Sequence, residues 1–263
     1  MDHIQVGGYR IAFEKAGEGA PVVLLHGGLS DHREWRSQIQ GLEGEFVMIA
    51  WDAPGCGASS DPPETLGLDG YASCLAEFID NLKLVKPHIV GLSFGAGLAL
   101  ELYKQRPDLP RSLTLVSAYA GWAGSLSPTE VEARLRQVMR QSELPAEDVV
   151  DSWLPDLLTT GASPEIVDEL REIIGDFHPA GMRAMAHAFA NADLRPTLAE
   201  IRVPTLLIHG EADRRSPLES AREMKETIPD SRLVVISGAG HQVNMEASHR
   251  FNEELSHFLE ALL

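Results

Sequence analysis

The chain has 263 residues, a length that fits one large domain or two small ones, and its 44% hydrophobic content is ordinary for a globule with a substantial core. Its 39 acidic and 22 basic side chains leave a formal net charge of -17, which repels nucleic-acid phosphates and anionic membrane surfaces. We therefore expect neither nucleic acid nor a membrane as a partner.

The two cysteines and the N-terminus bear on the cellular compartment. Cys56 and Cys74 form neither a Cys-x-x-Cys pair nor part of a cysteine and histidine cluster, so no disulfide framework and no structural metal is indicated. The first residues show no basic run followed by an apolar stretch, and no segment reaches the roughly 18 apolar residues of a membrane span. We expect a soluble, cytoplasmic protein.

From the N-terminus, short apolar runs alternate with longer amphipathic stretches. The runs end at turn-forming residues and predict strands at 9–13, 22–25, 46–51, 88–92 and 111–117. Residues 94–105 follow a helical pattern that stops before Pro107, because proline disfavours helix in the residue that precedes it. Strands that alternate with helices are typical of a parallel sheet with helices on both faces, so we predict an α/β fold.

The pattern changes between about residues 119 and 196, where helix-like stretches such as 130–141 and 165–174 follow one another without a strand. This segment predicts an inserted helical cap. Strand-like runs return after it. They lie at 205–208 and 233–236, with a helix predicted at 217–227 and a closing amphipathic helix at 244–262. We therefore divide the chain into a core, residues 1–118 and 197–263, and a cap, residues 119–196.

Gly91-Leu92-Ser93-Phe94-Gly95 matches the pattern Gly-x-Ser-x-Gly at the junction of a predicted strand and a predicted helix. In such a nucleophile elbow a strained turn exposes the serine hydroxyl, and side chains two residues to either side would collide with the strand and the helix. The helix N-terminus also favours developing negative charge. The alternative interpretation is a tight glycine turn with an N-capping serine. The position of the motif favours Ser93 as a nucleophile.

Two further catalytic candidates follow later strands. The loop after the strand at 205–208 offers Asp213 and a competing carboxylate, Glu211, which is closer to the strand; open α/β sheets build their sites in such loops, and Asp213 is our candidate acid. His241 lies in a glycine-rich loop after the last strand and is the candidate general base. Alone, each has an ordinary explanation as a turn aspartate or a solvated histidine. Together with Ser93 they have the order Ser, Asp, His, which is that of α/β-hydrolases.

The sequence resembles the α/β-hydrolase superfamily over nearly its whole length. The segments that carry the resemblance are His26-Gly27-Gly28, Asp52-Ala53-Pro54-Gly55-Cys56-Gly57-Ala58-Ser59, the serine elbow, His209-Gly210-Glu211-Ala212-Asp213 and Gly240-His241. The resemblance implies the α/β-hydrolase fold, a mostly parallel central sheet flanked by helices, with an inserted cap. It also implies an oxyanion hole formed by the backbone amides of Gly28 and Phe94, and no metal or organic cofactor.

The resemblance implies a hydrolase and leaves the substrate open. Dehalogenases and epoxide hydrolases of this fold have an aspartate at the elbow, whereas this chain has Ser93. We therefore expect cleavage of a small carboxylic ester or lactone through an acyl-serine intermediate. In this respect the chain is similar to small bacterial esterases and 3-oxoadipate enol-lactonases. The alternatives are a carbon–carbon bond hydrolase, a cofactor-free haloperoxidase or perhydrolase on the same triad, and a ligand-binding receptor without catalysis. The oligomeric state also stays open.

Apolar and cationic side chains near these segments are candidates for substrate contacts. The expected apolar pocket wall consists of Leu29, Trp122, Trp153, Met182, Met185 and Phe189, for which plain cap packing is the alternative interpretation. An anionic lactone would need a nearby cation. The arginines available for it, each of which also fits an ordinary surface position, are Arg33, Arg183, Arg214 and Arg215.

Overall fold

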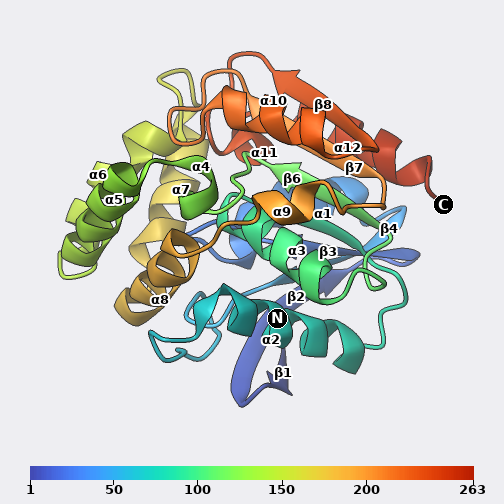
Figure 1. Cartoon of the computed structure of the whole chain (residues 1–263), viewed down its shortest axis with the longest axis horizontal. Coiled ribbons are helices and arrows are strands. Elements are labelled where there is room, and N and C mark those ends of the chain that lie inside the picture. Colours follow the sequence, from blue (N-terminus) through green and yellow to red (C-terminus); the bar gives the residue numbers. More distant parts are fainter.

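A computed structural model describes all residues from 1 to 263 and contains one eight-stranded sheet with helices on both faces (Figure 1). The strands are β1 (Asp2–Val6), β2 (Tyr9–Ala16), β3 (Ala20–Leu25), β4 (Phe46–Trp51), β5 (His88–Leu92), β6 (Ser112–Val116), β7 (Thr205–Gly210) and β8 (Ser231–Ile236). Their order is β1-β2-β4-β3-β5-β6-β7-β8. β2 pairs antiparallel with both β1 and β4, and all other neighbours are parallel. The predicted mostly parallel α/β sheet is confirmed.

Apolar residues on both faces of the central strands divide the core into two layers. In β3, Val23 and Leu25 face the layer that contains α2 (Gly67–Asn81) and α3 (Phe94–Gln105). Val22 and Leu24 face the opposite layer, which contains η1 (His32–Trp35), α1 (Arg36–Leu42) and α12 (Ser248–Glu260). A sixth helix, α10 (Leu218–Thr227), packs against β7 and β8. Helices on both faces explain why these strands are continuous apolar runs.

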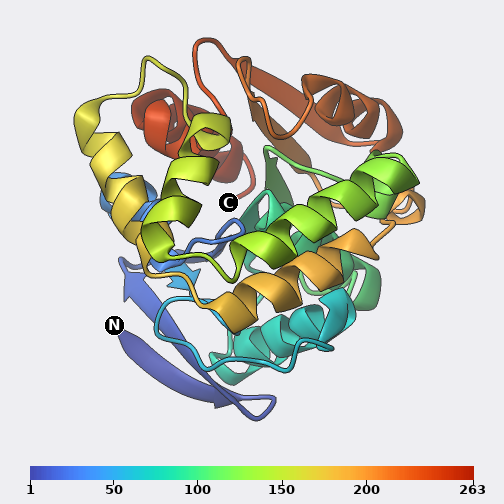
Figure 2. The same cartoon turned by 90° about the vertical axis from the view of Figure 1, so that its left-hand side faces the viewer.

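Helices alone connect β6 to β7, which confirms the predicted helical insertion. They are α4 (Trp122–Ser125), α5 (Pro128–Gln141), α6 (Ala146–Leu157), α7 (Pro164–Gly175), α8 (Pro179–Ala190) and α9 (Arg195–Leu198). Three of them, α5, α7 and α8, begin with a proline, which is tolerated in the first turn because that amide has no helical acceptor. Figure 2 shows α8 between α5 and α2, so the insertion rests on the sheet domain through α8. The bounds of cap and core stay a prediction.

The end of the chain differs from the single helix predicted at 244–262. Two helices, α11 (Val243–Glu246) and α12, are separated by Ala247, whose φ of -127° and ψ of 42° lie outside the helical region. The carboxylate of Glu246 accepts hydrogen bonds from the amides of Gly240 and Thr159 and holds α11 against the loop that precedes it. None of the helices in the structure has both the length and the apolar character needed to cross a lipid bilayer.

Candidate active site

Ser93 forms the turn between β5 and α3 with φ 53° and ψ -107°, a conformation that is costly for a residue with a side chain. The flanking glycines make the turn sterically feasible. A Cβ atom at Gly91 would lie 2.2 Å from the Gly95 carbonyl oxygen, and one at Gly95 would lie 2.1 Å from the Leu25 carbonyl oxygen. The Ser93 amide donates a hydrogen bond of 2.9 Å to the carbonyl of Val116 on the neighbouring strand. The predicted elbow geometry is therefore present.

His241 and Asp213 meet across the ends of β7 and β8. The imidazole Nδ1 of His241 lies 2.9 Å from Oδ2 of Asp213, and both side chains are buried. The other carboxylate oxygen accepts hydrogen bonds from the amides of Arg215 and Ser216 at 2.8 and 2.9 Å. Burial raises the pKa of Asp213, but the charge and hydrogen bond of His241 and the Ser216 amide outweigh it, so the pKa is below its ordinary value. The structure thus brings Asp213 to His241, whereas Glu211 is exposed at the strand end.

One largely apolar cavity contains both Ser93 and His241 in its wall. The residues predicted as its apolar wall, Leu29, Trp122, Trp153, Met182, Met185 and Phe189, all line it. The Phe189 ring packs edge-on against Phe94 with centroids 5.6 Å apart, and this contact joins α8 to the helix that follows the nucleophile. Their role in substrate binding stays a prediction. Sequence reasoning missed Arg134, Tyr119, Val138 and Gln242, which also line the cavity.

The turn after β3 presents a free backbone amide to this cavity. Gly28 lines the cavity, and its amide donates no hydrogen bond within the protein. Phe94 is the first residue of α3, where an amide has no helical acceptor. Gly27 is fixed by two bonds: its amide donates to Oε1 of Glu34 at 2.9 Å, and its carbonyl lies 2.8 Å from Nδ1 of His26. The amides of Gly28 and Phe94 are therefore available for an oxyanion.

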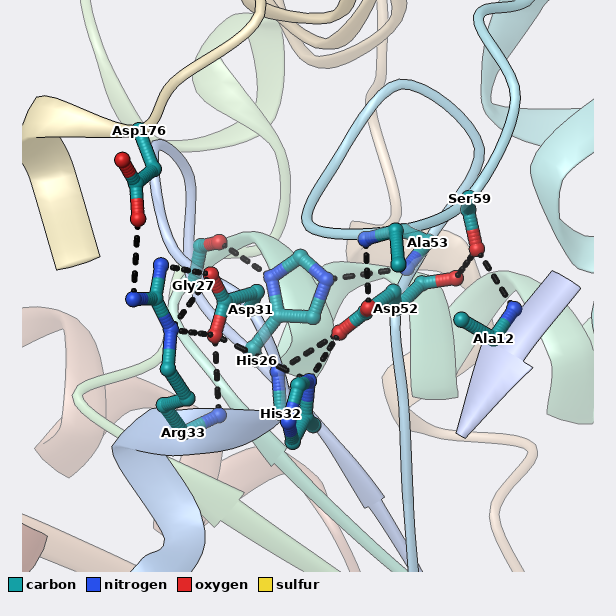
Figure 3. Close-up of polar contacts among 11 residues, drawn as sticks. Ala12, His26, Gly27, Asp31, His32, Arg33, Asp52, Ala53, Ser59 and Asp176 are labelled. Carbon is teal, nitrogen blue, oxygen red and sulfur yellow. Dashed lines mark hydrogen bonds and ion pairs between the residues drawn. The ribbon is translucent and has the colours of Figure 1, made fainter. Parts of the chain in front are cut away.

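His26 anchors this turn to the loop after β4, as Figure 3 shows. Its Nε2 accepts a hydrogen bond of 2.9 Å from the Ala53 amide, so the proton is on Nδ1, which donates to the Gly27 carbonyl. Burial lowers the pKa of His26 more than the Gly27 hydrogen bond and nearby carboxylates raise it. A neutral imidazole in one tautomer thus holds the glycine turn against the rest of the core.

A group that could hold a metal ion lies beside this turn, formed by Asp31, His32 and Asp52. Its ligand atoms already have partners, however. Nδ1 of His32 lies 2.7 Å from Oδ1 of Asp52, whose other oxygen accepts from the Ala58 amide at 2.8 Å (Figure 3). Both oxygens of Asp31 accept from the Arg33 guanidinium. These bonds account for the cluster as a structural support of the loop.

The arginines named as candidate cations have different positions. Arg33 is bound to Asp31 and lies 2.9 Å from Asp176 at the end of α7 (Figure 3). Arg183 is paired with Glu64 at 2.6 Å. Arg214 lies outside the cavity wall, and Arg215 alone of the four is part of it.

Comparisons with known proteins agree with this fold. A family model described as "Alpha/beta hydrolase family" matches residues 22–254. A thermophilic esterase from Thermogutta terrifontis, solved with malate bound, is 29% identical, with 100% of this chain and 99% of that chain covered and a TM-score of 0.93. A bromoperoxidase from Bacillus anthracis is 26% identical over 98% of this chain and 100% of its own, with a TM-score of 0.89. The 2-hydroxy-6-oxo-2,4-heptadienoate hydrolase of Pseudomonas putida is 28% identical over 98% of this chain and 95% of its own.

Proposed function

Because this chain belongs to the alpha/beta hydrolase family, we propose that it is a serine hydrolase that cleaves a small carboxylic ester or lactone through an acyl-serine intermediate. The observation that carries the proposal is the shared cavity of Ser93, on its strained turn, and His241, which is bonded to Asp213. The likeness to an esterase over the whole chain supports an ester as the substrate.

In the first half of the reaction Ser93 is the nucleophile. Because Nδ1 of His241 faces Asp213, Nε2 is left to take the hydroxyl proton as Oγ attacks the carbonyl carbon. The negative charge that develops on the carbonyl oxygen is stabilised by the amides of Gly28 and Phe94. When the tetrahedral intermediate collapses, the bond to the alcohol oxygen breaks and His241 returns the proton to that oxygen. The acyl group is then joined to Ser93.

In the second half a water molecule replaces the alcohol. His241 takes a proton from the water as its oxygen attacks the acyl carbon, the bond to Ser93 breaks, and the proton returns to Oγ. Asp213 holds the imidazole in the required tautomer and stabilises the imidazolium. Its pKa below the ordinary value keeps it ionised at neutral pH, as this role requires.

The bromoperoxidase and the heptadienoate hydrolase indicate what else this triad could perform here. Perhydrolysis and carbon–carbon bond cleavage both start from the same serine and histidine, so the triad itself favours none of the three reactions. Ester or lactone hydrolysis is proposed because the esterase likeness extends over 100% of this chain with the TM-score of 0.93.

A fluorophosphonate probe tests the nucleophile without an assumed substrate. We expect one adduct per chain in the intact mass, because an activated serine attacks the phosphorus and displaces fluoride. The adduct should be lost in Ser93→Ala and retained in Ser73→Ala, a matched change at an exposed serine of α2. An unlabelled wild-type chain would contradict the proposal and favour the ligand-binding receptor.

The rate of labelling tests the acid. Asp213→Asn should slow labelling by roughly 10³- to 10⁴-fold, because the amide favours the wrong imidazole tautomer. Glu211→Gln makes the same chemical change on the exposed competitor and should leave the rate unaltered. The opposite pattern would reassign the acid to Glu211.

A further inference from the structure

Two arginines line the active-site cavity without a carboxylate partner. Arg134 comes from α5 and Arg215 from the loop after β7, and neither forms an ion pair. Aromatic rings hold both. The Arg134 guanidinium lies 5.4 Å from the Trp122 ring centroid and donates a hydrogen bond of 3.1 Å to the Tyr119 hydroxyl. The Arg215 guanidinium lies 3.8 Å from the Trp153 ring centroid. Both side chains are thus fixed with donors left over.

Both arginines are partly buried, and loss of hydration makes the position of Arg215 costly unless an anion completes it. Desolvation lowers the pKa of Arg215 to about 10, so the side chain stays cationic at neutral pH but lacks much of its hydration. A cation over an aromatic face recovers only part of that loss. The carboxylates whose charges raise the pKa of Arg215 are Asp156 and Asp213, and Asp213 is already bonded to His241. Neither forms an ion pair with Arg215.

The same two arginines separate the active-site cavity from a second, polar cavity. Arg134, Val138, Trp153 and Arg215 line both, and the polar cavity contains a further arginine but only one acid, Asp156. In a chain with 39 acidic and 22 basic side chains, a wall with this excess of positive charge is a local reversal of the overall charge. The potential at this wall therefore favours an anion.

We infer that Arg134 and Arg215 form a carboxylate subsite, so that the substrate is an ester or lactone with a second, free carboxylate. Two guanidinium groups suit the planar, two-oxygen shape of a carboxylate. The apolar residues Met182, Met185 and Phe189 line the same cavity as Ser93 and both arginines, and they offer apolar surface to the hydrocarbon part of such a substrate. This inference rests on the proposed serine hydrolase activity for the reaction, and on the arginines alone for the binding of the anion.

A pair of substrates with the same acyl length measures the preference. 4-Nitrophenyl hydrogen adipate ends in a carboxylate and 4-nitrophenyl hexanoate ends in a methyl group. We expect the ratio of kcat/KM for the first over the second to fall roughly ten- to hundredfold in Arg134→Gln and in Arg215→Gln, the range given by loss of one charged hydrogen bond. Arg136→Gln, on the same helix but exposed and paired with Glu132, should leave the ratio unchanged. Equal kcat/KM for the two esters in the wild-type chain would overturn the inference.

Binding without turnover separates the two proposals. Adipate should slow fluorophosphonate labelling of the wild-type chain, adipamide should not, and Arg134→Gln should remove the effect of adipate. If the probe labels no serine, calorimetric titration measures the binding of adipate and of adipamide to the wild-type chain and to Arg134→Gln instead. If Ser93 is labelled but adipate neither binds nor slows labelling, the carboxylate subsite is overturned and the serine hydrolase is retained. If adipate binds to a chain that the probe does not label, the subsite is retained and the serine hydrolase is overturned. Circular dichroism and Tm confirm that each variant is folded.

Discussion

Glu34 has a buried carboxyl group directly beneath the glycine turn of the candidate oxyanion hole. One oxygen accepts from the Gly27 amide at 2.9 Å, and the other lies 3.5 Å from the side-chain nitrogen of Gln242, the residue after His241. Burial raises the pKa of Glu34 to about 8, against the opposing effect of hydrogen bonds from Gly27 and Gln242. Glu34 is therefore largely protonated at neutral pH, and a neutral group joins the turn to the histidine loop.

This raised pKa predicts how stability changes with pH. Between the ordinary value of 4.5 and about 8, the unfolded chain releases a proton that the folded chain keeps, so the free energy of unfolding falls as pH rises and levels off above 8. Glu34→Gln removes this titration, and the unpaired side-chain oxygen of Gln242 can accept the new amide hydrogen. In urea unfolding, the free energy of unfolding of Glu34→Gln relative to that of the wild type should increase by about 3 kcal/mol between pH 6 and pH 9. The exposed Glu211→Gln is the control, and a difference that does not change with pH would contradict the raised pKa of Glu34.

At the scale of elements, α8 approaches the core through two glycines. A Cβ atom at Gly181 would lie 1.9 Å from the Gly55 carbonyl oxygen, and Gly55 itself has a φ of 83°. Since both partners of this contact are backbone, a larger residue can be accepted only if α8 moves. Met182, Met185 and Phe189 lie on α8, so such a movement alters the active-site cavity.

Gly181→Ala should therefore reduce both stability and labelling. Overpacking of this kind costs about 1–3 kcal/mol, which corresponds to a Tm lower by roughly 2–10 °C for a chain of this size. Gly175→Ala, at the end of α7 with open space around it, is the matched control and should maintain Tm or raise it slightly. Thermal unfolding and the fluorophosphonate rate check the two effects, and an unchanged Tm in Gly181→Ala would show that α8 is not tightly held.

The elements that could be predicted from the sequence are those defined by local pattern. β4, β5 and α3 have the predicted bounds because apolar runs and turn residues determine them. The order of Ser93, Asp213 and His241 along the strands predicted that Asp213 would lie beside His241 and that Ser93 and His241 would share a cavity, while their catalytic roles stay a prediction. The break at Ala247 lies beside Glu246, whose carboxylate binds the Gly240 and Thr159 amides, and nothing in the local sequence indicates it. Arg134 and Glu34 are further cases. Each lies in a polar stretch, and only the packing of α5 over the cavity and of η1 under the glycine turn gives it its environment.

At the scale of the whole molecule, ion pairs connect the helical insertion to the core. They are Arg33 with Asp176, Arg36 with Glu169 and Arg183 with Glu64. All three involve partly or largely exposed side chains, so each contributes about 0–1 kcal/mol at most. Against them stands the mutual repulsion of a net charge of -17. We expect the repulsion to dominate the response of the folded chain to salt.

Raising NaCl from about 0.01 M to about 0.2 M shortens the screening length from roughly 30 Å to below 10 Å, which removes long-range repulsion while contacts under 4 Å persist. Tm at pH 8 should therefore rise with salt by a few degrees. The rise should be smaller at pH 5.5, because the net charge decreases toward the isoelectric point of about 4.9. Differential scanning calorimetry at the two pH values checks this, with sucrose as an uncharged control for exclusion effects. A Tm that falls with salt at pH 8 would mean that the ion pairs between insertion and core outweigh the repulsion. In that case Arg36→Gln, which removes one of these pairs, should lower Tm at low salt only.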